Sequence, residues 1–213
     1  MVKIYKNRLK ILLLCLVTVL MSIFILCSLS GASVANENSV KMPVIMYHSV
    51  LKDKSSQNDF VVSPELFEND LKYYKENGYT TVTVNDLIDY VYSDKLLPQK
   101  CVMLTFDDGY YNNYKYVYPL LKKYGAKAVI SPIAKLSEDY TAVGEENANY
   151  GHLLENNIKE MNESGFVEFQ NHSYNMHSLT PRKGIGKKYG ESDENYRSAI
   201  TSDISKAQDY LKM

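Results

Sequence analysis

The sequence predicts an α/β fold built on a parallel sheet, curled or open. Short β-branched segments alternate along the chain with segments whose apolar residues recur at helical spacing, as strands and crossover helices do. Residues 102–106 have the apolar composition of a buried strand and run directly into Asp107-Asp108-Gly109. The composition, with 45% of the 213 residues hydrophobic and 23% charged, is that of an ordinary globular domain.

Five strands and five helices are expected in the part of the chain that follows its N-terminal apolar segment. The strands are expected at residues 42–47, 79–83, 102–106, 128–133 and 167–170. The helices are expected at residues 64–77, 84–92, 110–124, 152–163 and 191–213, with polar loops at 52–59 and 134–149.

The first two helices carry clear end signals. Ser63 is a favourable N-cap, Pro64 suits the first helical turn, and Gly78 suits the residue after the last turn. Thr83 and Asp86 have the spacing of a capping box, with an aspartate in the place of the usual glutamate or glutamine.

The N-terminus has the pattern of an export signal. Residues 1–10 contain four basic and no acidic residues, residues 11–29 are apolar, and small residues lead to Ala35. This pattern predicts a signal peptide over residues 1–35, cleaved after Ala35. Because the apolar run has 19 residues, an uncleaved N-terminal membrane anchor is the alternative. Either version places the chain outside the cell, secreted or at the extracellular face of the cytoplasmic membrane, with a linker at residues 36–41.

Charge and cysteine content limit the partners. Without the four basic residues of the signal, 20 basic and 25 acidic residues remain, a net charge of −5, so we expect no nucleic-acid partner. We expect membrane contact only through the N-terminal segment, and a monomer. Cys101 is the one cysteine beyond that segment and cannot form an internal disulfide, so it is interpreted as a small buried hydrophobic residue.

Polar residues that could carry chemistry follow three of the predicted strands. His48 follows the first strand, Asp107 and Asp108 the third, and His172 and His177 the fifth. Parallel α/β folds collect ligands at the carboxyl ends of their strands. A carboxylate with two imidazoles is a usual ligand set for a catalytic zinc ion, and a second carboxylate could serve as a base.

Each of these features also has a simpler interpretation. Asp-Asp-Gly alone suits a turn, and the histidines alone could be ordinary surface or core residues. Since His172 and His177 lie five residues apart, they cannot share one face of a regular helix and converge only if the segment turns. Their joint occurrence at strand ends favours the metal site.

Two motifs resemble those of polysaccharide deacetylases, the NodB homology domain or carbohydrate esterase family four. TFDDG (residues 105–109) resembles the first motif of that family, and HSYNMH (residues 172–177) the second. The usual second motif, His-Ser/Thr-x-x-His, is one residue shorter. The longer spacing and MYHSV (residues 46–50) are similar to the branch that deacetylates poly-N-acetylglucosamine.

The resemblance implies an exported, metal-dependent hydrolase that removes N-acetyl groups from a glycan and releases acetate. It implies Asp107 as the general base and Asp108, His172 and His177 as ligands of a divalent metal, Zn²⁺ with Co²⁺, Ni²⁺ or Fe²⁺ as alternatives. The glycan could be an exopolysaccharide, peptidoglycan, chitooligosaccharide or acetylated xylan.

The resemblance also implies a distorted (β/α) barrel over residues 42–213. We expect it to be incomplete, with about five parallel strands, because the family's later motifs have no counterpart before Met213. Those motifs supply an arginine that orients the base and, in many members, a histidine that acts as general acid. We expect Tyr47 and His48 to contact the substrate. The alternative function is a truncated, non-catalytic protein that at most binds metal or glycan.

Overall fold

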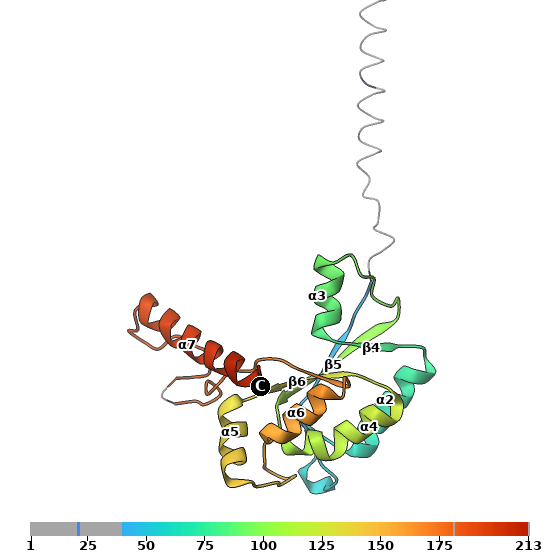
Figure 1. The fold of residues 1–213 in the computed structure, drawn as a ribbon, viewed down its shortest axis with the longest axis horizontal. Coiled ribbons are helices and arrows are strands. Elements are labelled where there is room, and N and C mark those ends of the chain that lie inside the picture. The colour runs from blue at the N-terminus through green and yellow to red at the C-terminus, as the bar shows by residue number, and fades with distance from the viewer. Residues whose placement is uncertain (1–20, 22–39, 181, 213) are drawn as a thin grey trace, which may run out of the picture. The chain divides into compact units, whose positions relative to one another are not determined.

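A parallel sheet of five strands forms the centre of the protein (Figure 1). The computed structural model describes residue 21, residues 40–180 and residues 182–212. The predicted signal peptide or anchor, Met21 apart, and most of the predicted linker lie outside these residues. Among the residues described, no helix has both the length and the hydropathy needed to cross a bilayer.

The longest strand lies in the middle of this sheet. The five strands are β1 (Val44–Tyr47), β4 (Thr80–Val82), β5 (Cys101–Asp108), β6 (Ala128–Pro132) and β7 (Val167–Phe169). β1 pairs with one edge of β5, while β4 and β6 share the other edge, β4 beside the start of β5 and β6 beside its end. β7 continues the sheet beyond β6. All five predicted strands are present and parallel, which confirms the predicted fold class.

A second, smaller sheet was not predicted. β2 (Ser49–Val50) and β3 (Val61–Val62) pair in parallel, with a short 3-10 helix, η1 (Lys54–Ser56), in the loop between them. Two-residue strands leave no periodic pattern in the sequence, which explains why they were missed.

The helices largely follow the predicted order. They are α2 (Pro64–Glu76), α3 (Val84–Tyr92), the π-helical turn η2 (Asn113–Val117) with α4 (Tyr118–Tyr124), α5 (Ala134–Val143), α6 (Glu155–Glu163) and α7 (Asp193–Leu211). The end signals are confirmed: the Ser63 hydroxyl accepts a hydrogen bond from the amide of Leu66, and Thr83 and Asp86 form the capping box.

Two predictions around residues 134–163 were wrong. The predicted polar loop contains α5, whose first residue, Ala134, has no side-chain N-cap before it and therefore gave no start signal. The next helix begins at Glu155 and not at His152. Residues 151–153 are held extended instead, because the carbonyl of Gly151 accepts from the Tyr111 amide and the Leu153 amide donates to the Gly109 carbonyl.

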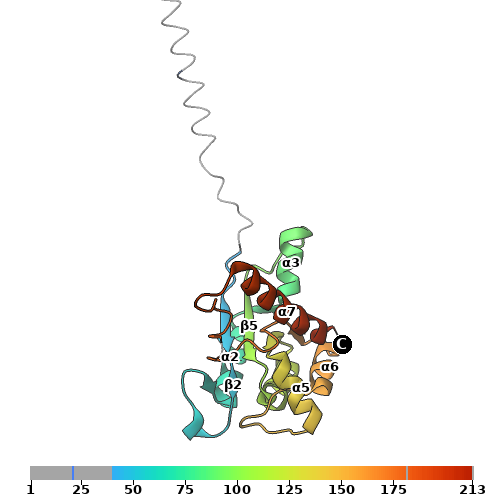
Figure 2. The ribbon, with the colours of Figure 1, turned by 90° about the vertical axis from the view of Figure 1, so that its left-hand side faces the viewer.

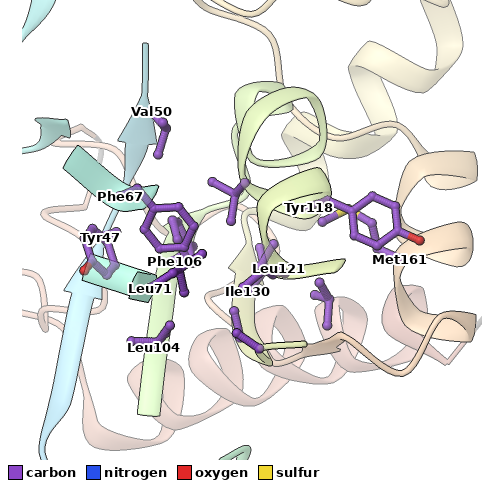
Figure 3. Close-up of a cluster of buried hydrophobic side chains, with 14 of the residues drawn as sticks. Tyr47, Val50, Phe67, Leu71, Leu104, Phe106, Tyr118, Leu121, Ile130 and Met161 are labelled. Carbon is purple, nitrogen blue, oxygen red and sulfur yellow. The ribbon is translucent and has the colours of Figure 1, made fainter. Parts of the chain in front are cut away.

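The main core lies between the central sheet and the helices α2, α4 and α6 (Figure 3). Its centre is an aromatic group: the Phe67 ring meets those of Tyr47 and Phe106 edge-on, at centroid distances of 5.3 and 5.4 Å. Tyr47 stacks on Phe106 at 5.1 Å. Because Phe106 directly precedes Asp107, this packing anchors the carboxyl end of β5 to the core.

Candidate metal centre and active site

The strands bring together five of the six predicted site residues. His48 directly follows β1, Asp107 and Asp108 end β5, and His172 comes three residues after β7. Since all these strands are parallel, their carboxyl ends meet at the same edge of the sheet. His177 joins them because the chain turns between it and His172.

Asp108, His172 and His177 form a compact group of ligand atoms. The Nε2 atoms of His172 and His177 lie 3.4 and 3.5 Å from Oδ1 of Asp108. One ligand atom from each residue lies within 4.8 Å of the others, and in the part of the chain that the structure describes no other such group of histidine, cysteine or acidic residues is found. The two imidazole rings are tilted, with centroids 5.0 Å apart.

The geometry of this group suits a metal ion. Ligands about 2.0 Å from a tetrahedral zinc ion lie about 3.3 Å from one another, close to the observed separations. Oδ1 of Asp108 is buried and has no hydrogen-bond donor among the described residues. A buried carboxylate oxygen without a partner is costly, and a cation between it and the two imidazoles would satisfy it.

The backbone of Asp108 has an unusual conformation. Its φ angle is +67°, in the left-handed region that aspartate adopts more readily than most residues, and Gly109 follows at +69°. The Asp108 carbonyl accepts a hydrogen bond from the Ile133 amide at 3.2 Å. This conformation directs the carboxylate toward the histidines, so the strain is held at the candidate site.

His152 supports the same carbonyl, and its position was not predicted. Its Nδ1 lies 3.1 Å from the carbonyl oxygen of Asp108, and its ring stacks on Tyr110 at 4.9 Å. Burial lowers the pKa of His152, so the ring is neutral and, in the Nδ1–H tautomer, donates to Asp108. No periodicity or motif in the sequence marks this residue.

Asp107 lies beside the metal-ligand group with His48 as its neighbour. Nε2 of His48 is 3.8 Å from Oδ2 of Asp107, and both side chains are partly exposed, 20% and 24%. The resemblance implied an orienting arginine only in motifs downstream of His177. The structure places His48, which directly follows β1, close to Asp107.

Two buried asparagines hold the segment that carries His48. Asn113 donates from Nδ2 to the His48 carbonyl at 3.0 Å, and Asn112 accepts from the Val50 amide at 2.9 Å. Asn112 also donates to the Ser49 hydroxyl at 2.8 Å. The sequence analysis did not single out these two residues. Consecutive asparagines in a predicted helix indicate a role only once they are known to be buried, as both are here.

Tyr47 lies apart from the other predicted site residues. Its ring is in the aromatic core, and its hydroxyl donates to Oδ2 of Asp70 at 2.8 Å. Burial, with the hydrogen bond to Asp70, raises its pKa. In this structure the residue supports β1 and does not face the site.

Comparison with known proteins agrees with this arrangement. The family model described as polysaccharide deacetylase matches residues 94–213, more than half of the chain. The chain belongs to the polysaccharide deacetylase family. The match includes Asp107, Asp108, His172 and His177, while His48 lies before it. The family predicted from the TFDDG and HSYNMH motifs is therefore confirmed.

Individual polysaccharide deacetylases show the extent of the similarity. YxkH of Bacillus subtilis (strain 168) is 36% identical over 157 residues, 72% of this chain and 51% of that protein. The poly-beta-1,6-N-acetyl-D-glucosamine N-deacetylase of Staphylococcus aureus (strain MRSA252) is 30% identical over 154 residues, 72% of this chain and 49% of that protein. The chain thus spans about half the length of these curated relatives.

A solved structure shares the fold. The de-N-acetylase from Aggregatibacter actinomycetemcomitans superposes with a TM-score of 0.69 at 27% identity, over 80% of this chain and 74% of that chain. The polysaccharide deacetylase type of (β/α) fold is thereby confirmed. Among the described residues the sheet remains open, because β1 and β7 each pair with a single strand.

Proposed function

We propose that this protein is an exported, metal-dependent hydrolase that removes N-acetyl groups from a glycan. One observation carries the proposal: the buried, unpartnered Oδ1 of Asp108 lies 3.4 and 3.5 Å from Nε2 of His172 and Nε2 of His177, and Asp107 directly precedes Asp108 in β5. Membership of the polysaccharide deacetylase family supports the reaction class. Export is proposed from the basic and apolar pattern of residues 1–35.

The proposed roles follow from the positions of the side chains. Asp108, His172 and His177 would hold a divalent metal ion, which would polarise the acetamide carbonyl and lower the pKa of a water molecule. Asp107 would take the proton of the attacking water as general base. Asp107 would then pass this proton to the amine as the C–N bond breaks, and His48, with Nε2 3.8 Å from Oδ2 of Asp107, would keep the carboxylate oriented.

A substrate can reach the site from solvent. The His177 side chain is 53% exposed and that of Asp107 is 24% exposed. A relative is named as a poly-beta-1,6-N-acetyl-D-glucosamine N-deacetylase, which makes N-acetylglucosamine polymers our first choice of substrate. We propose Zn²⁺ as the metal, with Co²⁺, Ni²⁺ and Fe²⁺ as alternatives for the same ligands.

Metal analysis and acetate release together test the proposal. The purified protein should retain about one metal ion per chain after dialysis, and the His172→Ala/His177→Ala double variant should lose it. Asp107→Asn should keep the metal but release acetate from N-acetylglucosamine oligomers about 100-fold to 10,000-fold more slowly, because it lacks the base. Asp209→Asn, on the exposed part of α7, is the matched control and should change neither quantity.

Two results would contradict this scheme. Equal metal content in the wild type and the double histidine variant would rule out the proposed metal centre. Metal binding without acetate release from any N-acetylated glycan would instead favour the alternative, a protein that only binds metal or glycan.

A further inference from the structure

Helix α7 contacts the rest of the protein at several points along its length. Ala207 is its one buried residue among those described, and Tyr210 packs against the main core. The helix lies beside α5, and it faces the loop between His172 and His177 (Figure 2). The contacts with that loop indicate why the helix docks there.

One carboxylate on α7 holds two consecutive amides of the loop. Oδ1 of Asp203 accepts from the Tyr174 amide at 2.8 Å, and Oδ2 accepts from the Asn175 amide, also at 2.8 Å. Both amides lie in the four-residue stretch that separates His172 from His177. The two oxygens of Asp203 are thus both used to fix the turn that brings the histidines together.

Two neighbouring contacts also join this turn of α7 to the histidine-bearing segment. Nδ2 of Asn171 donates to the carbonyl of Ile204 at 2.9 Å, and Nζ of Lys206 lies 3.7 Å from the centre of the Tyr174 ring. These contacts lie on the same turn of α7 as Asp203. The helix therefore contacts the loop through one backbone carbonyl and through the side chains of Asp203 and Lys206.

The opposite side of the loop is held by the start of α5. The amide of Ala134 donates to the Ser173 carbonyl at 3.1 Å, and the amide of Lys135 donates to the Tyr174 carbonyl at 2.9 Å. Carbonyls of the loop thus have donors from α5, while two of its amides depend on Asp203. Without the carboxylate, those two amides would have only water as acceptor, and this side of the turn would lose its support.

We propose that Asp203 is a positioning residue for the candidate metal centre. Its carboxylate fixes the turn between His172 and His177 so that both imidazoles face Asp108. The histidines lie five residues apart in a segment that is not a regular helix, so the amides of residues 174 and 175 have no helical acceptors and use Asp203 instead. The inference rests on the proposed function of the cluster as a metal centre.

Zinc titration of the full chain against a chelating dye tests this role. Asp203→Ala should weaken zinc binding about tenfold, the effect typical of residues that support metal ligands from behind. Asp203→Asn keeps one acceptor oxygen and should show a smaller loss. Asp209→Asn, a change of the same residue type on the same helix, should bind zinc as the wild type does.

Hydrogen exchange without metal gives a second readout. In Asp203→Ala the amides of residues 174 and 175 should exchange faster than in the wild type, while the strands of the central sheet stay protected. If Asp203→Ala does not fold, the comparison of Asp203→Asn with the wild type gives the same two measurements.

Three results would overturn the inference or separate it from the proposed function. Wild-type zinc affinity in Asp203→Ala would overturn it, and so would equal losses in the Ala and Asn variants, which would indicate a charge effect only. If the wild type binds no zinc, cobalt or nickel, the metal centre itself is wrong, and so is a positioning role for Asp203.

Discussion

Substitution of Gly109 by alanine should destabilise the protein more than its small size suggests. The residue has a φ angle of +69°, and an added Cβ would lie 2.5 Å from Cβ and 2.8 Å from Cα of Pro132. The left-handed conformation costs about 1–2 kcal/mol for a residue with a side chain. The overlap adds about 1–3 kcal/mol, because Pro132 pairs with Asp108 in the sheet and cannot move freely. The expected loss is therefore about 2–5 kcal/mol.

Gly125→Ala separates the two contributions. Gly125 has a φ angle of +66°, but an added Cβ there would meet nothing within 4 Å. Its loss should be limited to about 1–2 kcal/mol. Urea unfolding followed by tyrosine fluorescence measures both, since the chain has 19 tyrosines and no tryptophan. Equal losses in the two variants would refute the predicted contact with Pro132.

Three further predictions concern the core, the segment that carries His48 and acid stability. Phe67→Ala should cost about 3–5 kcal/mol in urea unfolding, because the ring is fully buried. Asn113→Ala should slow acetate release about tenfold with metal content unchanged, since the His48 carbonyl loses its donor. Hydrogen bonds from Arg182 lower the pKa of Glu191 to about 2, so the stability from this pair should be present above pH 4.5 and be lost between pH 4.5 and 2.

Each of these predictions has a control. Leu66→Ala, next to Phe67 but largely exposed, should change stability by less than about 0.5 kcal/mol. A loss of metal in Asn113→Ala would show that the residue supports more than His48. In Glu191→Gln, the stability difference from the wild type should shrink as the pH falls from 5 to 3, and a constant difference would contradict the assigned ion pair.

The strands of the central sheet and the three candidate metal ligands could be predicted from the sequence. Strand positions could be predicted because each strand is a short segment rich in apolar or β-branched residues, bounded by polar residues or glycine. The convergence of Asp108 with His172 and His177 followed from their places after parallel strands. The turn that brings His172 and His177 together involves a side chain distant in the sequence, that of Asp203.

The supporting residues could not be predicted in this way. The role of Asn113 depends on a carbonyl 65 residues earlier in the chain, and that of Asp203 on amides about 30 residues earlier. His152 was assigned to a helix because its backbone bridge to Tyr110 leaves no local pattern. Tyr47 was expected to contact the substrate as part of the MYHSV segment, whereas its ring packs in the core, and alternate residues of a strand face opposite sides.

The position of Asp203 in the sequence has a consequence for the order of events during synthesis. All the strands of the sheet, and all three candidate metal ligands, precede α7 in the chain. A nascent chain that has emerged only as far as His177 has every ligand side chain but lacks the carboxylate that shapes their loop. High-affinity metal uptake would then begin only after α7 has emerged and docked, and so would report the completion of folding rather than its start.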